Sequence, residues 1–449
     1  MNTPPPPRVS SYQRLKEKLA RNPSERIEKK DWPQPKNVSE LLNHAIKGGA
    51  RSFLLAYGLR AGVNFCLYLL RVMRKRAPLS NILVASFKNL DSVRFGAMFG
   101  SFAFLWKLVN NGMRIYRGKD DRLNGLISGA IAGLSILFEK KDRRVDIAQQ
   151  LLVRALQAVY NAGKARDIFH FKNGDALLFG LTSAQVLYSY TMQPTTLPPD
   201  FYSFMLKAAR CPEEGLKLNA KNVRGLPITP EEVLNGIQKL RPTPRALAVA
   251  STITPHPIAV PCETLHPWMD SCNAIAVERF TKVFKSMMPV YGTLHFIPML
   301  LFRRKLLRSD PTKMISKTTW ATLKSGAFLA TFVTLYQYQV CMHRNLLDAG
   351  WIRFNHKYLY YIFGFVCSYS SIFLEDKKRR SELALYVLPK AVQSFYQILY
   401  QKHMMIKIKH FEVIMSSVAM GIIMSFYQEE ADVLSSFVRK LMYQFVQKN

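Results

Sequence analysis

The feature that most constrains this chain is a regular glycine spacing inside an apolar segment. Gly125, Gly129 and Gly133 recur every fourth residue between Leu123 and Phe138. In a helix this spacing places all three on one face, which then carries no side chains. A second helix can approach such a face backbone to backbone, as small-xxx-small faces do inside a bilayer. The segment therefore predicts a helix that packs against a partner within a membrane.

A run of charged residues ends this apolar segment and recurs later in the chain. Ser371 to Arg380 corresponds without a gap to Ser135 to Arg144, 236 positions earlier, and apolar helices are expected to flank both. Such a match in register is rare by chance, and membrane proteins often contain internal repeats. We therefore predict an internal duplication with a repeated charged loop. Its residues are Glu139, Arg143, Arg144, Glu375, Arg379 and Arg380.

Three roles are open for the repeated charged loop. Its carboxylates and guanidiniums can pair at helix ends and set the turn between helices. The arginines can instead bind anionic lipid head groups, or the run can be a solvated charged surface. Recurrence in both halves of the chain favours the structural role.

Composition separates a membrane protein from a nucleic-acid binder. The formal net charge of +33 would suggest nucleic acid in a soluble protein, but 49% of the 449 residues are hydrophobic and they gather in blocks. Lysine and arginine lie at the edges of these blocks, as in helices anchored to lipid head groups. We expect the bilayer as partner, together with membrane proteins or further copies of the chain, and no nucleic acid.

The blocks predict an all-α, multi-pass membrane protein with two related helical bundles. Several blocks are shorter than the roughly 20 residues of a perpendicular span, so the number of crossings is left open. A short helix is expected at Pro230 to Lys239 in the linker, capped by Thr229. The predicted parts are a polar, proline-rich tail (1–46), a first transmembrane bundle with the glycine zipper (47–193), a polar linker (194–260), and a second transmembrane bundle with a Cys/His segment and an amphipathic C-terminal tail (261–449).

Further small and polar residues stand inside the apolar blocks. Helix packing is predicted for Gly58, Gly62, Gly96 and Gly100 in addition to the three glycines above. Arg60, Asn64 and Lys107 are predicted to be polar residues within the membrane. A charge there is costly unless it faces a partner, water or a cavity, or extends to the interface.

A cysteine–histidine segment begins the second bundle. Cys262, His266 and Cys272 give three soft ligands within eleven residues, but structural zinc normally takes four. His256 and Cys211 are the candidates for a fourth ligand. We favour a packing role for the three residues, and so predict no bound metal and no cofactor. The chain also lacks the GxxxxGK[ST], HExxH, GxSxG and Rossmann motifs, so an enzyme is not expected.

This second half resembles a known family. The segment CETLHPWMDSC (262–272), the later stretches at 298–305 and 324–329, and the hexad 375–380 resemble the transmembrane protein 135 family. The first half, with Phe95-Gly96 and the glycine zipper, resembles the other half of that family, in swapped order. The resemblance implies a multi-pass protein of the peroxisomal or mitochondrial membrane. More distantly, the glycine-rich halves look like pore-forming subunits of mitochondrial import translocases.

The family resemblance implies a non-enzymatic role in membrane organisation, organelle dynamics or lipid metabolism. Two alternatives remain: a transporter or channel for metabolites or lipids, and a component of a protein-import translocase. A polar, continuous cavity lined by Arg60 or Lys107 would favour transport. A dry seam packed on glycine would favour a scaffold.

Overall fold

The computed structural model describes residues 35–73, 82–168, 171–302, 309–406 and 408–446, in which every regular element is a helix. This confirms the predicted all-α fold. The chain divides into two compact units, Met1–Phe171 with Ile408–Asn449, and Lys172–Lys407. Most of the predicted tail, including its expected helix at 12–21, lies outside the described residues.

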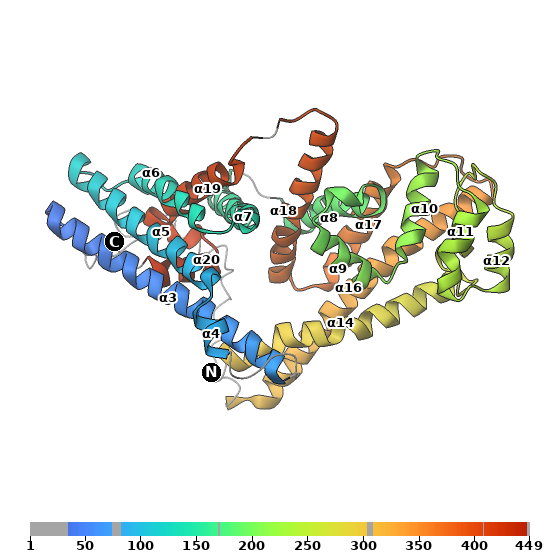
Figure 1. Cartoon of the computed structure of the whole chain (residues 1–449), viewed down its shortest axis with the longest axis horizontal. Helices are drawn as coiled ribbons and strands as arrows, with labels where there is room; N and C mark the ends of the chain where they lie inside the picture. The colour runs from blue at the N-terminus through green and yellow to red at the C-terminus, as the bar shows by residue number, and fades with distance from the viewer. Residues whose placement is uncertain (1–34, 74–81, 169–170, 303–308, 407, 447–449) are drawn as a thin grey trace, which may run out of the picture. The chain divides into compact units, whose positions relative to one another are not determined.

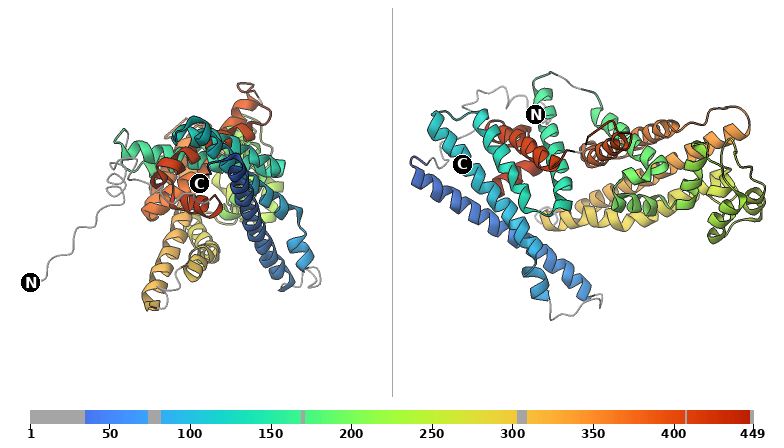
Figure 2. Two further views of the ribbon diagram at one scale, coloured as in Figure 1. Left: turned by 90° about the vertical axis from the view of Figure 1, so that its left-hand side faces the viewer. Right: turned by 45° about the horizontal axis from the view of Figure 1, so that its top comes forward.

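The first unit combines the first helices of the chain with its last ones (Figure 1). Its helices are α3 (Val38–Met73), α4 (Ile82–Phe87), α5 (Leu90–Arg117), α6 (Arg122–Ala132) with its 3-10 extension η3 (Gly133–Phe138), α7 (Lys141–Ala165), α19 (Phe411–Glu429), η7 (Ala431–Val433) and α20 (Ser436–Phe445). Helix α3 lies alongside α5, and α19 packs against α6 and α7 (Figures 1 and 2).

Local sequence signals set the ends of these helices. Asn89 and Asp121 cap α5 and α6, since their side chains accept hydrogen bonds from the amides of Asp91 and Asn124. Gly118 ends α5 with a φ of 60°, a left-handed conformation that glycine adopts at little cost. The short turn between these caps places α6 directly beside α5.

The predicted glycine face of α6 contacts the backbone of α19. A Cβ built on Gly129 would lie 2.6 Å from the Met420 carbonyl oxygen and 3.0 Å from the Gly421 Cα atom. A Cβ on Gly133 would lie 2.7 Å from the Ser417 Cα atom. Since real Cβ atoms do not approach so closely, only glycine permits this helix pair.

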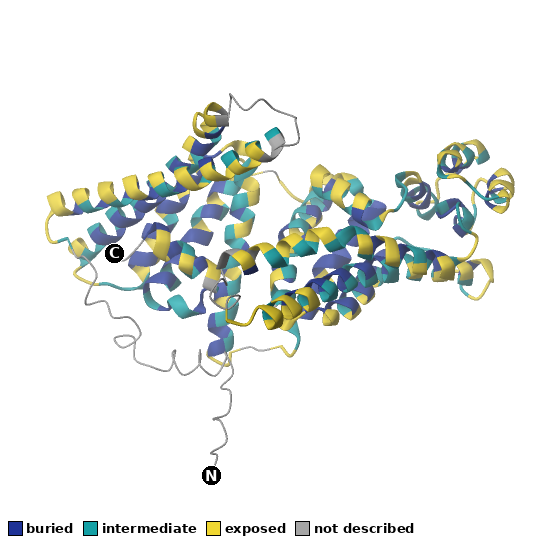
Figure 3. Ribbon diagram, turned by 90° about the horizontal axis from the view of Figure 1, so that it is seen from below, coloured by how far each residue is buried: buried dark blue, intermediate teal, exposed yellow. Residues whose placement is uncertain are grey.

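The opposite face of α6 and η3 is apolar and exposed. Its outward side chains are Leu123, Leu126, Ile127, Ile131, Leu134, Leu137 and Phe138. A helix with glycine inside and leucine outside has the pattern of a membrane helix, because lipid covers the large side chains. Figure 3 shows exposed residues along the outer sides of the helices and buried ones on their inner sides.

Two helices are long and apolar enough to cross a membrane by themselves. They are Val38–Leu69 within α3 and Phe411–Glu429, which is α19. The segments Arg122–Phe138 and Leu359–Leu374 are apolar but shorter. Length and composition therefore support membrane crossing most directly for α3 and α19.

The second unit contains the remaining helices. They are α8 (Gly174–Met192), η4 (Pro194–Thr196), α9 (Pro199–Ala209), α10 (Glu213–Val223), α11 (Pro230–Ile237), η5 (Gln238–Leu240), α12 (Pro244–Ser251), α13 (Cys262–Leu265), α14 (Cys272–Phe302), α16 (Pro311–Asp348), α17 (Leu359–Ser371), η6 (Ile372–Leu374) and α18 (Lys377–Gln401). Helices α14 and α16 run side by side (Figures 1 and 2), and α8 packs between α17 and α18.

The predicted polar linker is a folded helical part of the second unit. Its apolar residues are too few to form long blocks, but they meet in one cluster: Leu218, Ile228, Val233, Ile237, Ala250, Ile253 and Val260. The expected short helix is present as α11, and Thr229 accepts the predicted capping bond from the Glu232 amide at 3.3 Å. The segment is therefore more ordered than its composition suggested.

The helices of the two halves follow one another in the same order. Helix α18 begins 236 residues after α7, and α19 ends 237 residues after α8. The correspondence extends to the left-handed residues before the last two helices, Asn173 (φ 57°) and His410 (φ 58°). The duplication as an evolutionary event stays a prediction, but the repeated element order agrees with it.

The compact units differ from the two predicted bundles. Helix α8 belongs to the first half of the sequence, yet it packs against α17 and α18 in the second unit. Its counterpart α19 packs against α6 and α7 in the first unit. Each unit thus holds one helix from the other half. The sequence repeat could not reveal this exchange, because both partners carry similar faces.

The other predicted glycines divide into two groups. Gly96 and Gly100 of α5 pack closely on α3, where a Cβ at either position would meet Phe53 at 3.1 and 2.8 Å. Gly58 and Gly62 were wrongly assigned to helix packing, because they lie on the exposed face of α3 and a Cβ at either position would meet nothing within 4 Å. The glycine of α3 that meets Gly100 is Gly49, whose carbonyl oxygen would lie 3.1 Å from a Cβ at position 100.

Alanine substitution should separate these two groups. Gly129→Ala places a Cβ against the α19 backbone and should destabilise the protein by about 1–3 kcal/mol. Gly58→Ala should leave stability unchanged or raise it by up to about 1 kcal/mol, since alanine is the better helix former. The thermal unfolding midpoint in detergent measures both. A Gly129→Ala variant as stable as Gly58→Ala would contradict the packing described here.

Candidate functional site

The second unit contains a cavity of about 370 Å³ among its helices. Side chains from α8, α9, α14, α16 and α18 line it, and nearly all of these are apolar. Phe328 and Phe332 of α16 face Phe179 of α8 in its wall, with ring centroids 5.8 and 6.2 Å from that of Phe179. A cavity of this size and lining suits the apolar part of a small molecule or lipid.

Two arginines with little solvent contact interrupt the apolar lining. The side chains of Arg279 and Arg344 are 6% and 5% exposed, and both border the cavity. Within the described part of the chain, no acidic side chain forms an ion pair with either. The Nε atom of Arg279 and one terminal nitrogen of Arg344 are buried without a hydrogen-bond partner. Their positive charges are therefore only partly compensated by the protein.

Neutral neighbours hold both guanidiniums in place. Arg279 lies over the Trp268 ring, 6.0 Å from its centroid, which is a cation–π contact. Arg344 donates to the side-chain oxygen of Asn219 at 2.5 Å, and the Tyr360 hydroxyl donates to the same oxygen at 2.8 Å. These contacts orient the arginines and leave donor groups available to an anion.

The electrostatics of Cys211 place both arginines near one point of the wall. Burial raises the pKa of the Cys211 thiol, and the positive charges of Arg279 and Arg344 partly offset this rise. Cys211 itself lines the cavity. The positive charge is therefore concentrated at the end of the cavity formed by the start of α10 and by α14 and α16.

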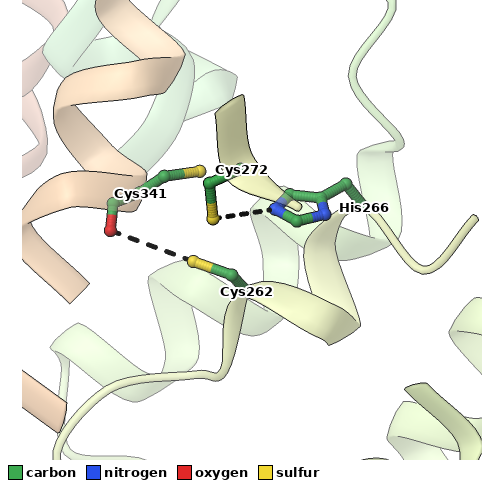
Figure 4. A group of neighbouring side chains, drawn as sticks. All are labelled: Cys262, His266, Cys272 and Cys341. Carbon is green, nitrogen blue, oxygen red and sulfur yellow. Dashed lines mark hydrogen bonds between the residues drawn. The ribbon is translucent and has the colours of Figure 1, made fainter. Parts of the chain in front are cut away.

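The cysteine–histidine segment forms a four-residue cluster beside this cavity (Figure 4). Cys262, His266 and Cys272 meet Cys341 of α16, and their ligand atoms all lie within 4.8 Å of one another. The fourth candidate is thus Cys341, and neither His256 nor Cys211 belongs to the cluster. Sequence reasoning missed Cys341 because it lies far along the chain inside an apolar block, where a thiol reads as a small hydrophobe.

Protons on the cluster respond to this crowding. Burial lowers the pKa of His266, but hydrogen bonding to Cys341, Met269 and Cys272 outweighs burial and raises the pKa to about 9. Hydrogen bonding to Cys341, together with burial, raises the pKa of Cys272 to about 12. Without a metal, these two side chains therefore hold their protons at neutral pH.

The repeated charged loop has the same geometry in both units. Glu139 and Glu375 are buried, and Arg143 and Arg379 lie 3.1 and 3.4 Å from them. In the first loop Arg144 donates to the carbonyl oxygens of Glu139 and Leu137 at 2.8 and 2.7 Å. Arg380 makes the equivalent bonds to Glu375 and Phe373 at 2.9 and 3.1 Å. The contacts agree with the predicted structural role at helix ends.

The predicted intramembrane polar residues lie in the first unit and do not line the cavity of the second. Arg60 is half-buried, and Asn64 donates to the Ser92 hydroxyl at 3.1 Å. Lys107 is buried, with its Nζ atom 3.0 Å from the His44 ring. Among the described residues, these three side chains border no large cavity. The geometry therefore does not provide the polar passage that a transporter built on them would need.

Comparison with known proteins places two segments of the chain in described families. Residues 260–400 match the N-terminal cysteine-rich region of transmembrane protein 135. Residues 38–157 match the Tim17/Tim22/Tim23/Pmp24 family. The chain is also 27% identical over 130 residues to outer envelope pore protein 16-4, chloroplastic, of Arabidopsis thaliana, covering 29% of this chain and 85% of that protein. No solved structure matches.

Fold and matches together define the class: this is a multi-pass α-helical membrane protein, and the similarities point to an organellar membrane. The predicted resemblance to the transmembrane protein 135 family is confirmed, with the likeness of the first half to the Tim17 group beside it. The cysteine-rich region is described as N-terminal in transmembrane protein 135, whereas here it lies in the second half. All four residues of the cysteine–histidine cluster fall within the matched segment.

Proposed function

We propose that this protein binds an anionic, amphiphilic lipid in the cavity of its second unit, and that it acts without catalysis in the lipid organisation of an organellar membrane. The observation that carries the proposal is the pair of buried arginines, Arg279 and Arg344, at the end of an apolar cavity. The apolar wall suits an acyl chain. The two guanidiniums suit a carboxylate or phosphate head group.

The energetics favour an anion at this point. A buried charge without a counter-charge costs several kcal/mol, so a protein keeps one where a ligand or partner compensates it. Arg344 already donates to Asn219, and its other terminal nitrogen is buried with no acceptor among the described residues. An oxyanion would accept charge-assisted hydrogen bonds from both arginines. The chemistry is shared by fatty acids and acidic phospholipids.

The peroxisomal or mitochondrial membrane is the proposed location. The resemblance to the transmembrane protein 135 family supports it, and the similarity to the Tim17/Tim22/Tim23/Pmp24 family is consistent with it. The similarity to an outer envelope pore protein of the chloroplast keeps the proposal at the level of organellar membranes in general.

Replacing both arginines should weaken lipid binding by roughly tenfold to a hundredfold, because each charge-assisted hydrogen bond contributes about 1.5–3 kcal/mol. The test compares the wild type, Arg279→Gln/Arg344→Gln and the control Arg353→Gln, an exposed arginine of the same unit. Fluorescent oleate, its uncharged methyl ester and phosphatidic acid serve as probes in detergent solution. We expect tight binding of one or both anionic probes by the wild type and the control.

The pattern across probes decides between outcomes. Oleate bound in preference to phosphatidic acid identifies a fatty acid site, and the reverse identifies a phospholipid site. Equal affinity for oleate and its methyl ester would contradict a role for the arginines, as would an unchanged affinity in the double variant. The thermal unfolding midpoint of each variant confirms that a loss of binding is not a loss of fold.

A second candidate function is supported by the similarity of residues 38–157 to the Tim17/Tim22/Tim23/Pmp24 family, and by the pore protein that matches over 130 residues. In this alternative the first unit would conduct a solute or a protein chain. Planar bilayer recordings of the purified protein test it. Discrete, voltage-dependent conductance that Lys107→Glu alters and Lys172→Glu does not would support a pore; a bilayer without conductance would exclude it.

A further inference from the structure

We propose that Cys262, His266, Cys272 and Cys341 together bind one zinc ion in a closed structural site. The residues come from three elements: α13 and the turn after it, the first residue of α14, and the second half of α16. This inference goes beyond the proposed lipid function and does not depend on it.

The geometry agrees with tetrahedral zinc coordination. With Zn–S bonds of about 2.3 Å and Zn–N bonds of about 2.0–2.1 Å, the ligand atoms of a tetrahedron lie roughly 3.5–3.8 Å apart. The Cys272 Sγ atom is 3.6 Å from His266 Nε2, and the four ligand atoms lie within 4.8 Å of one another. Small side-chain rotations therefore close the site around an ion without movement of the helices.

The neighbours of the cluster prepare its ligands. The Nδ1 atom of His266 is 2.8 Å from the Met269 carbonyl oxygen, so Nδ1–H donates there and Nε2 points to the sulfur atoms (Figure 4). This hydrogen bond is the usual partner of a zinc-binding histidine. Asn345 donates from its amide to the Cys272 sulfur at 3.8 Å, which also suits a thiolate ligand.

The ligand types select zinc and a structural role. Three thiolates and one imidazole favour zinc over the hard cations magnesium, calcium and manganese. Four protein ligands fill the coordination sphere and leave no open position for a substrate. Cys262 and His266 are buried, at 7% and 1% exposure, and none of the six cysteines forms a disulfide. A protected thiol cluster of this kind is stabilised by a metal rather than by oxidation.

The site would join segments that are distant in the sequence. Cys341 lies 69 residues after Cys272, and the ion would fix the short α13 and the start of α14 against α16. His266 and Cys341 also border the cavity, so the same ion would hold one part of its wall. Removing the ion should therefore loosen the second unit and leave the first unit unaffected.

Metal content tests the proposal directly. We expect the full chain, purified in detergent without chelator, to contain about one zinc ion per chain by mass spectrometry, and X-ray absorption to show sulfur at about 2.3 Å with one nitrogen ligand. Cys341→Ser should lose most of the zinc. Cys211→Ser and Cys367→Ser, which change cysteines outside the cluster, should keep it.

A conservative variant keeps the proposal testable if Cys341→Ser fails to fold. His266→Cys should retain zinc and change the absorption spectrum from three sulfur ligands to four. Wild-type protein that contains no zinc after expression in zinc-supplemented medium would overturn the proposal, as would a spectrum with oxygen and nitrogen ligands only. Lipid binding is measured separately, so its failure would leave this result unchanged.

Discussion

The close contact between α6 and α19 is the interaction on which the first unit depends. In a bilayer the hydrophobic effect does not drive helices together, so dispersion contacts and hydrogen bonds must do so. The glycine face of α6 lets the two backbones touch, and Ser416 of α19 donates to the Gly133 carbonyl oxygen at 3.1 Å across the seam. Further along, Asn110 of α5 donates to Gln428 at 2.8 Å. Small residues and buried polar bonds thus act together.

This contact also joins the two halves of the chain. Helix α19 comes from the second half but completes the first unit, while α8 makes the reciprocal contribution to the second. There the fit is different in detail: a Cβ on Gly364 of α17 would lie 2.9 Å from the Ala184 Cα atom, and Tyr188 stacks on Tyr361 with ring centroids 4.1 Å apart. The seam of the first unit is packed on glycine, whereas that of the second adds aromatic rings. The second unit also contains the large cavity and the cysteine–histidine cluster.

Much of the fold could be predicted from the sequence, because its signals are local. The four-residue period of the glycines predicted the packing face of α6, the Thr229 capping position predicted the start of α11, and the repeated hexad predicted the charged loop. The role of Gly58 and Gly62 was misjudged because spacing does not tell which side of α3 meets a neighbour. Gly49, the residue that does meet Gly100, stands outside that pattern.

The candidate site could be predicted only in part, because it depends on contacts between distant residues. The first three members of the cysteine–histidine cluster are close in sequence, and their spacing was recognised. Cys341 and the arginine pair become meaningful only when α14 and α16 lie side by side. The exchange of α8 and α19 could not be predicted either, since a repeat provides two equivalent partners for each helix.

The exchange of these two helices is the central claim, and cysteine cross-linking tests it most directly. A Cβ at position 421 would lie 3.4 Å from the Ala130 Cβ atom, close to the spacing of about 3.5–4.5 Å found in disulfides. The matched pair without exchange is Ala130 with Ala184, the counterpart of Gly421 in α8. With a protease site inserted at Lys172, the exchange predicts that Ala130→Cys/Gly421→Cys keeps the two fragments joined after oxidation and cleavage, and that Ala130→Cys/Ala184→Cys does not. Fragments joined only in the second variant would contradict it.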